Sequence, residues 1–281
     1  MDHTRKRFKK KNITNALLTV VGILVVVMIF LPILWMVRTS VITLVDLYER
    51  PLVLIFEPIF TAYKSVFAGQ DFLNRLLNSL IIAVATTLLC GITGALCAYG
   101  MSRFKLPGGM FLPFSYLFLR MIPSMAIVIP VFNTFKTLGL LDTRTGLVLV
   151  YTTFGLPLVV WTLWGFYKSI PRELEEAAAI DGSNALSTFV RVILPISVPS
   201  LASVSILTFT SAWNEFFFAM ILTSKNASTA PTAIALIINS LDLSWGEASA
   251  AGTLIILPVA IIGVIGQKYF ISGLSAGAVK G

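Results

Sequence analysis

Few side chains in this 281-residue sequence have the types and spacing that catalysis needs. His3 is the single histidine, so acid–base or metal chemistry that depends on imidazole has no site. Cys90 and Cys97 are seven positions apart, about 10 Å along one helix face, which is too far for a disulfide. No G-x-x-x-x-G-K-[ST] phosphate loop occurs. We expect a chain without catalytic residues, metal or cofactor of its own.

One polar segment, residues 168–195, has a pattern that predicts a specific structure. Its first helix begins with three glutamates, which favour the positive end of a helix dipole: Glu173, Glu175 and Glu176. Gly182 favours the end of that helix. Ser183 or Asn184 can cap a second short helix, which we expect to end at Pro195. The segment is thus predicted to form a helix–glycine–helix hairpin.

The predicted hairpin offers two surfaces. Four apolar residues are expected along one side of its second helix: Leu186, Phe189, Val190 and Ile193. Three consecutive alanines, Ala177 to Ala179, form a patch of small side chains that lets another surface approach closely. The residues alone leave two interpretations open, a docking element for another protein and an ordinary interfacial loop.

The elements that must position this hairpin are long apolar blocks. Hydrophobic residues make up 57% of the sequence and charged residues 12%, half of the roughly 25% that a soluble domain carries. This composition excludes a soluble enzyme, a disordered regulator and a free nucleic-acid binder. Each block is long enough to cross a hydrocarbon core of about 30 Å. The six blocks are about 13–37, 76–102, 110–135, 146–167, 196–224 and 248–267.

We therefore predict an all-α integral membrane protein with six transmembrane helices, because a lipid-exposed open sheet would leave backbone groups unpaired. One domain covers residues 1–281, with a tail at 1–12 and the segment 168–195 as the loop between the fourth and fifth spans. The first span is longer than the 7–15 residue core of a signal peptide, and no A-x-A-like cleavage site follows it. We expect it to stay attached.

The distribution of basic residues predicts the orientation. Thirteen of the 21 Lys and Arg residues fall on the side of the N-terminus and of segment 168–195, seven on the opposite side, and Arg120 within a span. The positive-inside rule then places both termini in the cytoplasm. We interpret the cluster from Arg5 to Lys11 as an anchor at anionic headgroups and not as a nucleic-acid site.

Two charged residues lie inside predicted spans, where such residues are functional candidates by default. Arg120 is near the membrane midplane, whereas Glu215 is close to the outer face. The axial gap of about 13 Å argues against a direct ion pair. With Asn214, both are candidates for a translocation path. The alternatives are that Arg120 snorkels to the interface and that Glu215 makes structural hydrogen bonds.

The hairpin sequence resembles the EAA loop of ABC-importer permeases, whose pattern is E-A-A-x3-G-x9-I-x-L-P. The matching residues are Glu176, Ala177, Ala178, Gly182, Leu194 and Pro195, with Val192 in place of Ile. Other stretches are similar to the carbohydrate-uptake branch, the maltose-type or MalG-like family. These are Asn78-Ser79, Met121-Ile122-Pro123 with Pro130, Leu138-Gly139-Leu140, Trp213-Asn214-Glu215-Phe216, and Gln267 with the tail from Gly273 to Gly281.

The resemblance implies a permease subunit of a binding-protein-dependent ABC importer in a bacterial inner membrane, which forms part of the path for a sugar or oligosaccharide. It implies four partners: a second, similar permease, an ABC ATPase dimer, an extracytoplasmic substrate-binding protein and the lipid membrane. ATP hydrolysis would then occur on a partner chain. A stand-alone secondary transporter or channel is the alternative, disfavoured because the two charged residues within spans form no obvious proton or sodium relay.

The resemblance also implies a role for each matching residue. Glu176 would pair with a basic residue of the ATPase, while Ala177 and Ala178 would permit close contact. Gly182 would make the turn. The Leu194-Pro195 pair would tie the hairpin to the fifth span. On the opposite side, the segment 224–247 would reach toward the binding protein, and a plain surface loop is the alternative.

Overall fold

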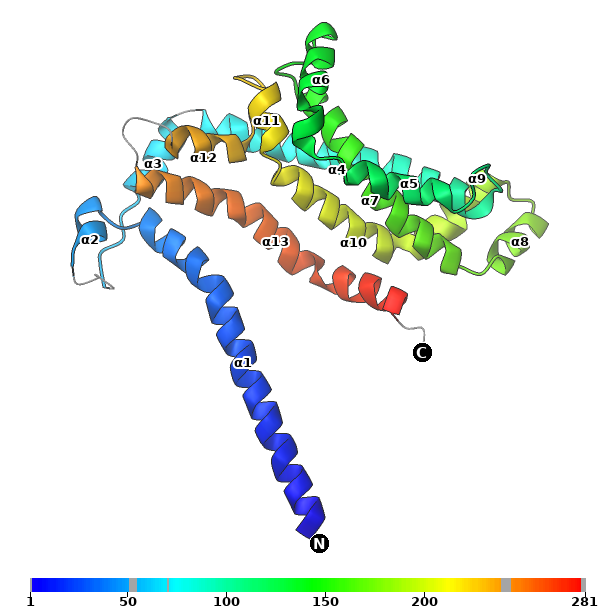
Figure 1. The fold of residues 1–281 in the computed structure, drawn as a ribbon, viewed down its shortest axis with the longest axis horizontal. Coiled ribbons are helices and arrows are strands. Elements are labelled where there is room, and N and C mark those ends of the chain that lie inside the picture. Colours follow the sequence, from blue (N-terminus) through cyan, green and yellow to red (C-terminus); the bar gives the residue numbers. More distant parts are fainter. Residues whose placement is uncertain (1, 51–54, 70, 239–243, 279–281) are drawn as a thin grey trace. The chain divides into compact units, whose positions relative to one another are not determined.

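The computed structural model describes the backbone of residues 2–50, 55–69, 71–238 and 244–278, and the side chains of these residues between 15 and 267. Its elements in these ranges are helices, without a strand (Figure 1). Five are long and apolar enough to cross a membrane: α1 (Asp2–Ser40), α4 (Phe72–Arg103), α7 (Arg144–Ser169), α10 (Leu194–Trp213) with the turns before it, and α13 (Trp245–Ala278). A bent pair, α5 with α6, makes a possible sixth span. The predicted all-α membrane architecture is confirmed.

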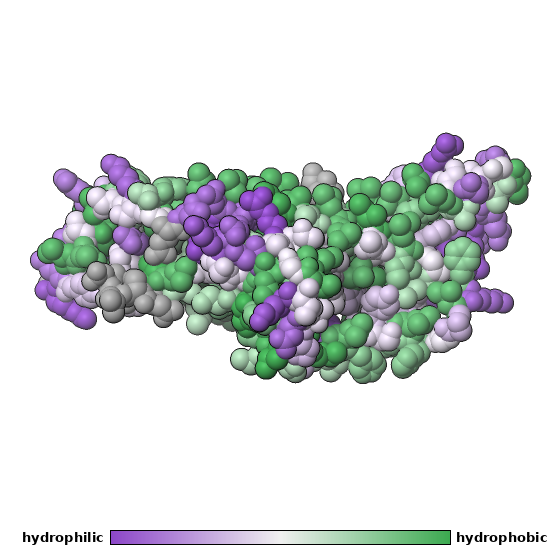
Figure 2. Space-filling view, turned by 90° about the horizontal axis from the view of Figure 1, so that it is seen from above, coloured by the Kyte–Doolittle hydropathy of each residue, from purple (hydrophilic) through white to green (hydrophobic). Residues whose placement is uncertain are grey.

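The long helices expose much of their apolar surface. None of the most apolar 18-residue window of α1 is buried, and only a third of the corresponding window of α4 is. Figure 2 shows exposed hydrophobic side chains as broad green areas. Exposed apolar patches of this extent are unfavourable in water, so lipid or partner chains must cover them.

Contacts divide the chain into two compact units. The first comprises residues 1–70 and 236–254, with α1, α2 (Leu44–Tyr48), α3 (Thr61–Ala68) and the start of α13. Here α13 approaches α1 closely, because a Cβ on Gly252 would lie 2.8 Å from the sulfur of Met36. The second unit comprises residues 71–235 and 255–281 and contains the remaining elements.

The core of the second unit lies between α4, α7 and α10. Its buried side chains include Tyr99 of α4, Leu163 of α7 and Val204 of α10. The helices α4 and α7 pack closely at Gly94, where a Cβ would lie 2.6 Å from Cγ1 of Val159. Glycine at this position lets the two backbones approach, as small residues do at helix interfaces in membranes.

The third predicted span, 110–135, is wrong as a single straight helix. The structure has α5 (Phe111–Arg120) and α6 (Ser124–Thr137), bent by 89° at a break. Pro123 explains the break, because it has no N–H to donate and its ring clashes with the carbonyl four residues earlier. It also disfavours helical backbone at Ile122. At about 1.5 Å per residue, neither helix alone crosses 30 Å.

The fifth predicted span, 196–224, is also interrupted. The helix α10 begins at Leu194 and ends at Trp213, and α11 (Phe217–Leu222) follows after a break. Pro195 does not end the preceding helix as predicted. It lies in the first turn of α10, where its missing N–H costs little. Within the segment 224–247, an apolar stretch forms the helix α12 (Ala230–Ile238), whereas residues 239–243 lie outside the described ranges.

Candidate functional site

The predicted hairpin is present, and local rules explain its turn. Its first helix is α8 (Glu173–Ile180). Gly182 follows with φ of 82°, a left-handed conformation that glycine adopts without strain. The N–H of Gly182 donates to the carbonyl of Ala179, and the N–H of Ser183 to that of Ala178. This pair of bonds is a Schellman motif, which satisfies carbonyls at the end of α8.

The second arm of the hairpin is α9 (Ala185–Thr188), which continues through the π-helical turn η1 (Phe189–Ile193) into α10. The side chain of Asn184 caps α9 by accepting a hydrogen bond from the N–H of Ser187 at 2.8 Å, as predicted. The expected single apolar side is wrong. Phe189 and Ile193 are buried in the core of the second unit, whereas Leu186 and Val190 are exposed.

The residues of the EAA-like pattern differ in exposure. Glu176 and Ala177 are exposed at the surface of α8, but Ala178 is buried within the chain. Leu194 is half-buried and packs against the core, while Pro195 is exposed. The surface that another protein can reach on this hairpin therefore includes Glu176 and Ala177 and excludes Ala178.

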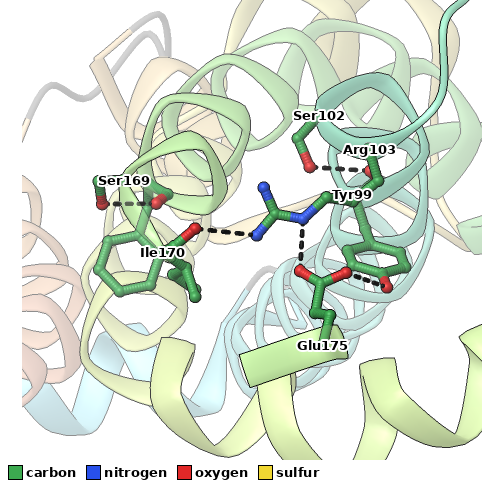
Figure 3. A network of polar contacts seen from close by, with 7 residues as sticks. Tyr99, Ser102, Arg103, Ser169, Ile170 and Glu175 are labelled. Atoms are coloured by element: carbon green, nitrogen blue, oxygen red, sulfur yellow. Dashed lines mark hydrogen bonds and ion pairs between the residues drawn. The ribbon is translucent and has the colours of Figure 1, made fainter. Parts of the chain in front are cut away.

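Glu175, which the sequence indicated only as one of three glutamates at the start of a helix, connects the hairpin to α4. Arg103, at the end of α4, donates from Nε to Oε1 of Glu175 at 2.5 Å. The hydroxyl of Tyr99 donates to the other carboxylate oxygen at 3.0 Å. A second guanidinium nitrogen reaches the carbonyl of Ile170 at 3.3 Å. Figure 3 shows the guanidinium between the carboxylate and this carbonyl.

This network is well shielded and involves a charged pair. The side chain of Arg103 is 8% exposed and that of Glu175 is 17% exposed. Hydrogen bonds to charged groups contribute roughly 1.5–3 kcal/mol each. Since Phe189 also packs on Tyr99, with ring centroids 4.9 Å apart, both arms of the hairpin are fixed to the same end of α4. The hairpin is therefore built to move together with that helix.

Arg120 and Glu215 line one cavity of about 250 Å³ in the second unit. Among the described residues, Arg120 and Glu215 form no ion pair with each other, but both side chains reach the same space. The Glu215 carboxylate accepts hydrogen bonds from the N–H groups of Phe218 and Ala219, at 3.0 and 3.3 Å, and so caps α11. Asn214 lies at the end of α10, is exposed, and is not among the residues that line the cavity.

A second polar network holds the beginning of the segment 224–247. Asp142, in left-handed conformation with φ of 55°, accepts hydrogen bonds from four consecutive backbone N–H groups: Ser224, Lys225, Asn226 and Ala227. The amide of Asn78 donates to two carbonyls of the same loop and accepts from Nε of Arg144 at 2.7 Å. These contacts give a physical role to the Asn78-Ser79 pair, since Ser79 accepts from the N–H of Ala230.

The pKa of Asp142 reflects this environment. Burial alone would raise it, but hydrogen bonds from the backbone of Asn226, Ser224 and Ala227 and from the Ser224 hydroxyl lower it to about 2. The N–H groups stabilise the ionised form. Asp142 is therefore a carboxylate at neutral pH, held by a loop rather than by a basic side chain.

Comparison with known families agrees with this architecture. Residues 90–275 match the family described as the binding-protein-dependent transport system inner membrane component. The matched range includes α7, the hairpin and α10. It also includes the break between α5 and α6 and the break between α10 and α11.

Individual relatives extend the similarity over nearly the whole chain. The trehalose transport system permease protein SugB of Mycobacterium tuberculosis is 39% identical, over 79% of this chain and 82% of its own. The trehalose/maltose transport system permease protein MalG of Thermococcus litoralis is 34% identical, over 97% and 99%. A crystal structure of a bacterial ABC transporter involved in the import of alginate includes a chain with a TM-score of 0.76 and 25% identity, over 93% of this chain and 97% of that one. This chain therefore belongs to the family of inner-membrane components of binding-protein-dependent transport systems.

Proposed function

We propose that this protein is a permease subunit of an ABC importer for a sugar or oligosaccharide, and that its hairpin couples ATP hydrolysis on a partner ATPase to movement of the membrane helices. The exposed Glu176 and Ala177 on α8 carry the proposal, because they leave a charged and small-residue surface open to a partner. The trehalose and maltose named for relatives support the carbohydrate class.

The proposed complex has the partners that such an importer requires. These are a second permease, two copies of an ATPase and an extracytoplasmic binding protein, all assembled in the membrane. Both termini and the hairpin lie in the cytoplasm in this proposal, on the side with the excess of Lys and Arg. The single membrane domain covers residues 1–281, and the segment 224–247 faces the binding protein.

Glu176 acts in this proposal as the anionic contact to the ATPase, with Ala177 allowing close approach. Gly182 shapes the turn, Ala178 packs inside the hairpin, and the Leu194-Pro195 pair joins it to α10. Closure of the ATPase dimer then pushes on α8, and the Arg103–Glu175 pair passes the displacement to α4. Nucleotide can drive this switch only through different affinities for the two states of the complex.

A charge reversal with a matched control tests the proposal. We expect Glu176→Lys to abolish ATP-dependent sugar uptake, because it repels the basic partner residue, while the chain still inserts in the membrane. Glu173→Lys makes the same change in the same first turn of α8, outside the EAA-like pattern, and should retain uptake. Co-purification of the ATPase with each variant is the second readout. Wild-type uptake by Glu176→Lys in an assembled complex would refute the coupling role.

A further inference from the structure

The cavity lies where two interrupted helices meet. Arg120 is the last residue of α5, and Ser124 is the first residue of α6 after the break. Glu215 lies in the break between α10 and α11. All three line the same space of about 250 Å³. Substrate sites in many membrane transporters lie where helices are interrupted, because the freed backbone and polar side chains can face a ligand there.

Two buried hydroxyl groups in this cavity form no hydrogen bond of ordinary geometry within the described residues. Thr86 of α4 is 1% exposed, and its Oγ1 makes no hydrogen bond to the described part of the chain. Tyr151 of α7 is 4% exposed, and its hydroxyl lies near the Glu215 carboxylate without a hydrogen bond of ordinary geometry. A buried hydroxyl without a hydrogen bond destabilises the folded protein. Both therefore favour a hydrogen-bonding ligand in the cavity.

Of the two charged side chains that line the cavity, Glu215 and Arg120, the arginine can donate hydrogen bonds to a ligand. Both carboxylate oxygens of Glu215 already accept hydrogen bonds from the backbone of α11. The Arg120 guanidinium has no acceptor or ion-pair partner among the residues that the structure describes. Its five N–H groups form a planar fork that suits a pair of neighbouring oxygen atoms.

The remaining wall is apolar and aromatic. The rings of Phe154 and Phe218 both line the cavity and lie with centroids 5.1 Å apart. A sugar ring has C–H faces that pack on apolar surfaces and a rim of hydroxyl groups that donate and accept hydrogen bonds. The volume lies just below the range of about 300–1,000 Å³ for sites that hold whole drug-sized ligands, which suits a single ring.

We propose that this cavity is a binding subsite for one sugar ring of the transported carbohydrate. Thr86, Tyr151 and Arg120 hydrogen-bond its hydroxyls, and Phe154 and Phe218 contact its apolar face. This chain would then contact the cargo itself, in addition to transmitting movement. The inference rests on the proposed function, because the ligand class is that of the proposed cargo.

Isosteric removal of single hydroxyls tests the subsite. The parent complex is first assayed for ATP-dependent uptake of radiolabelled trehalose, maltose and longer oligosaccharides in proteoliposomes with the binding protein. The sugar taken up is then used in equilibrium binding to the purified complex without the binding protein. We expect Thr86→Val and Tyr151→Phe each to raise the Kd about 2-fold to 10-fold, the loss of one hydrogen bond.

Two control variants separate ligand contact from helix stability. Thr86→Ser keeps the hydroxyl and should bind as the parent does. Thr87→Val makes the same change one residue along α4, where the hydroxyl already donates to the carbonyl of Ala83, and should also bind normally. ATP hydrolysis without the binding protein should be unchanged in Thr87→Val, which lies outside the proposed subsite. An unchanged Kd in both Thr86→Val and Tyr151→Phe would overturn the subsite.

The outcomes distinguish the two proposals. A parent complex that takes up sugar but binds none when the binding protein is absent overturns the subsite and leaves the proposed function intact. An equal loss of binding in Thr86→Val and Thr87→Val also overturns it, since the effect would then belong to the helix. A parent that takes up no carbohydrate overturns the proposed function and, with it, the ligand class of the cavity.

Discussion

Gly182 has a backbone conformation that costs most other residues about 1–2 kcal/mol. We predict that Gly182→Val distorts the turn after α8, because a β-branched residue is poorly tolerated at a φ of 82°. Uptake should be lost while the chain still reaches the membrane. Gly182→Asn is the control, since Asn enters the left-handed region more readily, and should retain most of the uptake. Equal uptake by both variants would mean that the turn geometry is unimportant.

Asp142 makes a pH-dependent contribution to stability. Its folded pKa of about 2 is below the ordinary value of 3.8, so the contribution is complete above the ordinary value and is lost as the pH falls through about 2. We predict that Asp142→Asn lowers the thermal unfolding midpoint of the detergent-solubilised protein by a constant amount above about pH 5. The difference from the parent should shrink between about pH 4 and pH 2. A difference that grows on acidification would contradict the assignment.

The role of a single residue was predictable where residues adjacent to it in the sequence determine that role. Gly182 and Asn184 follow local capping rules, and both have the predicted geometry. The ion pair of Glu175 and the role of Asp142 were missed because their partners are distant in sequence, 72 residues away for Arg103 and more than 80 for the loop at 224–227. Packing of α4 against α7 brings Arg103 to Glu175, and packing of α11 against α7 brings the loop to Asp142.

At the scale of elements, the link between α8 and α4 is a single ion pair with one supporting hydroxyl. We predict that Glu175→Arg alone destabilises the folded protein by about 1.5–3 kcal/mol, since it removes a hydrogen-bonded charge and opposes Arg103 with another cation. It should also reduce sugar uptake. The exchanged pair, Arg103→Glu with Glu175→Arg, should recover part of both losses. Thermal unfolding and ATP-dependent uptake are the two measurements.

The double variant distinguishes a specific contact from a general surface effect. Recovery in the exchanged pair shows that the two side chains interact. Losses that simply add in the double variant would show that the pair does not connect the hairpin to α4, and the movement would then have to pass through Phe189 and the π-helical turn alone.

The positions of the long helices were predictable from the length of their apolar blocks. The breaks within two of the predicted spans were not. Composition correctly indicates helices near 13–37, 76–102, 146–167 and 248–267. It does not detect the break at Pro123, because apolar residues continue on both sides of it. The break at Glu215 contains neither glycine nor proline. There the Glu215 carboxylate accepts hydrogen bonds from the first N–H groups of α11, which have no carbonyl partner within the helix. Pro195 was predicted to end a helix, but it lies in the first turn of α10, where proline is tolerated.

For the whole molecule, exposed apolar helices and an exposed hairpin both indicate that this chain functions in an assembly. The hairpin is the surface on which the account depends. Its most exposed large apolar residue is Ile180, at the end of α8 and 87% exposed. On α6, Met125 is similarly exposed, at 77%, and offers a control site of comparable size and polarity.

The most direct measurement is site-specific photocrosslinking in the intact importer. A photoreactive amino acid is placed at Ile180 or at Met125, the complex is irradiated in membranes, and the crosslinked chains are identified by mass spectrometry. If the hairpin docks on the ATPase, position 180 crosslinks to the ATPase and position 125 does not. Absence of the ATPase from the products at position 180, with the assembled complex still active, would contradict it.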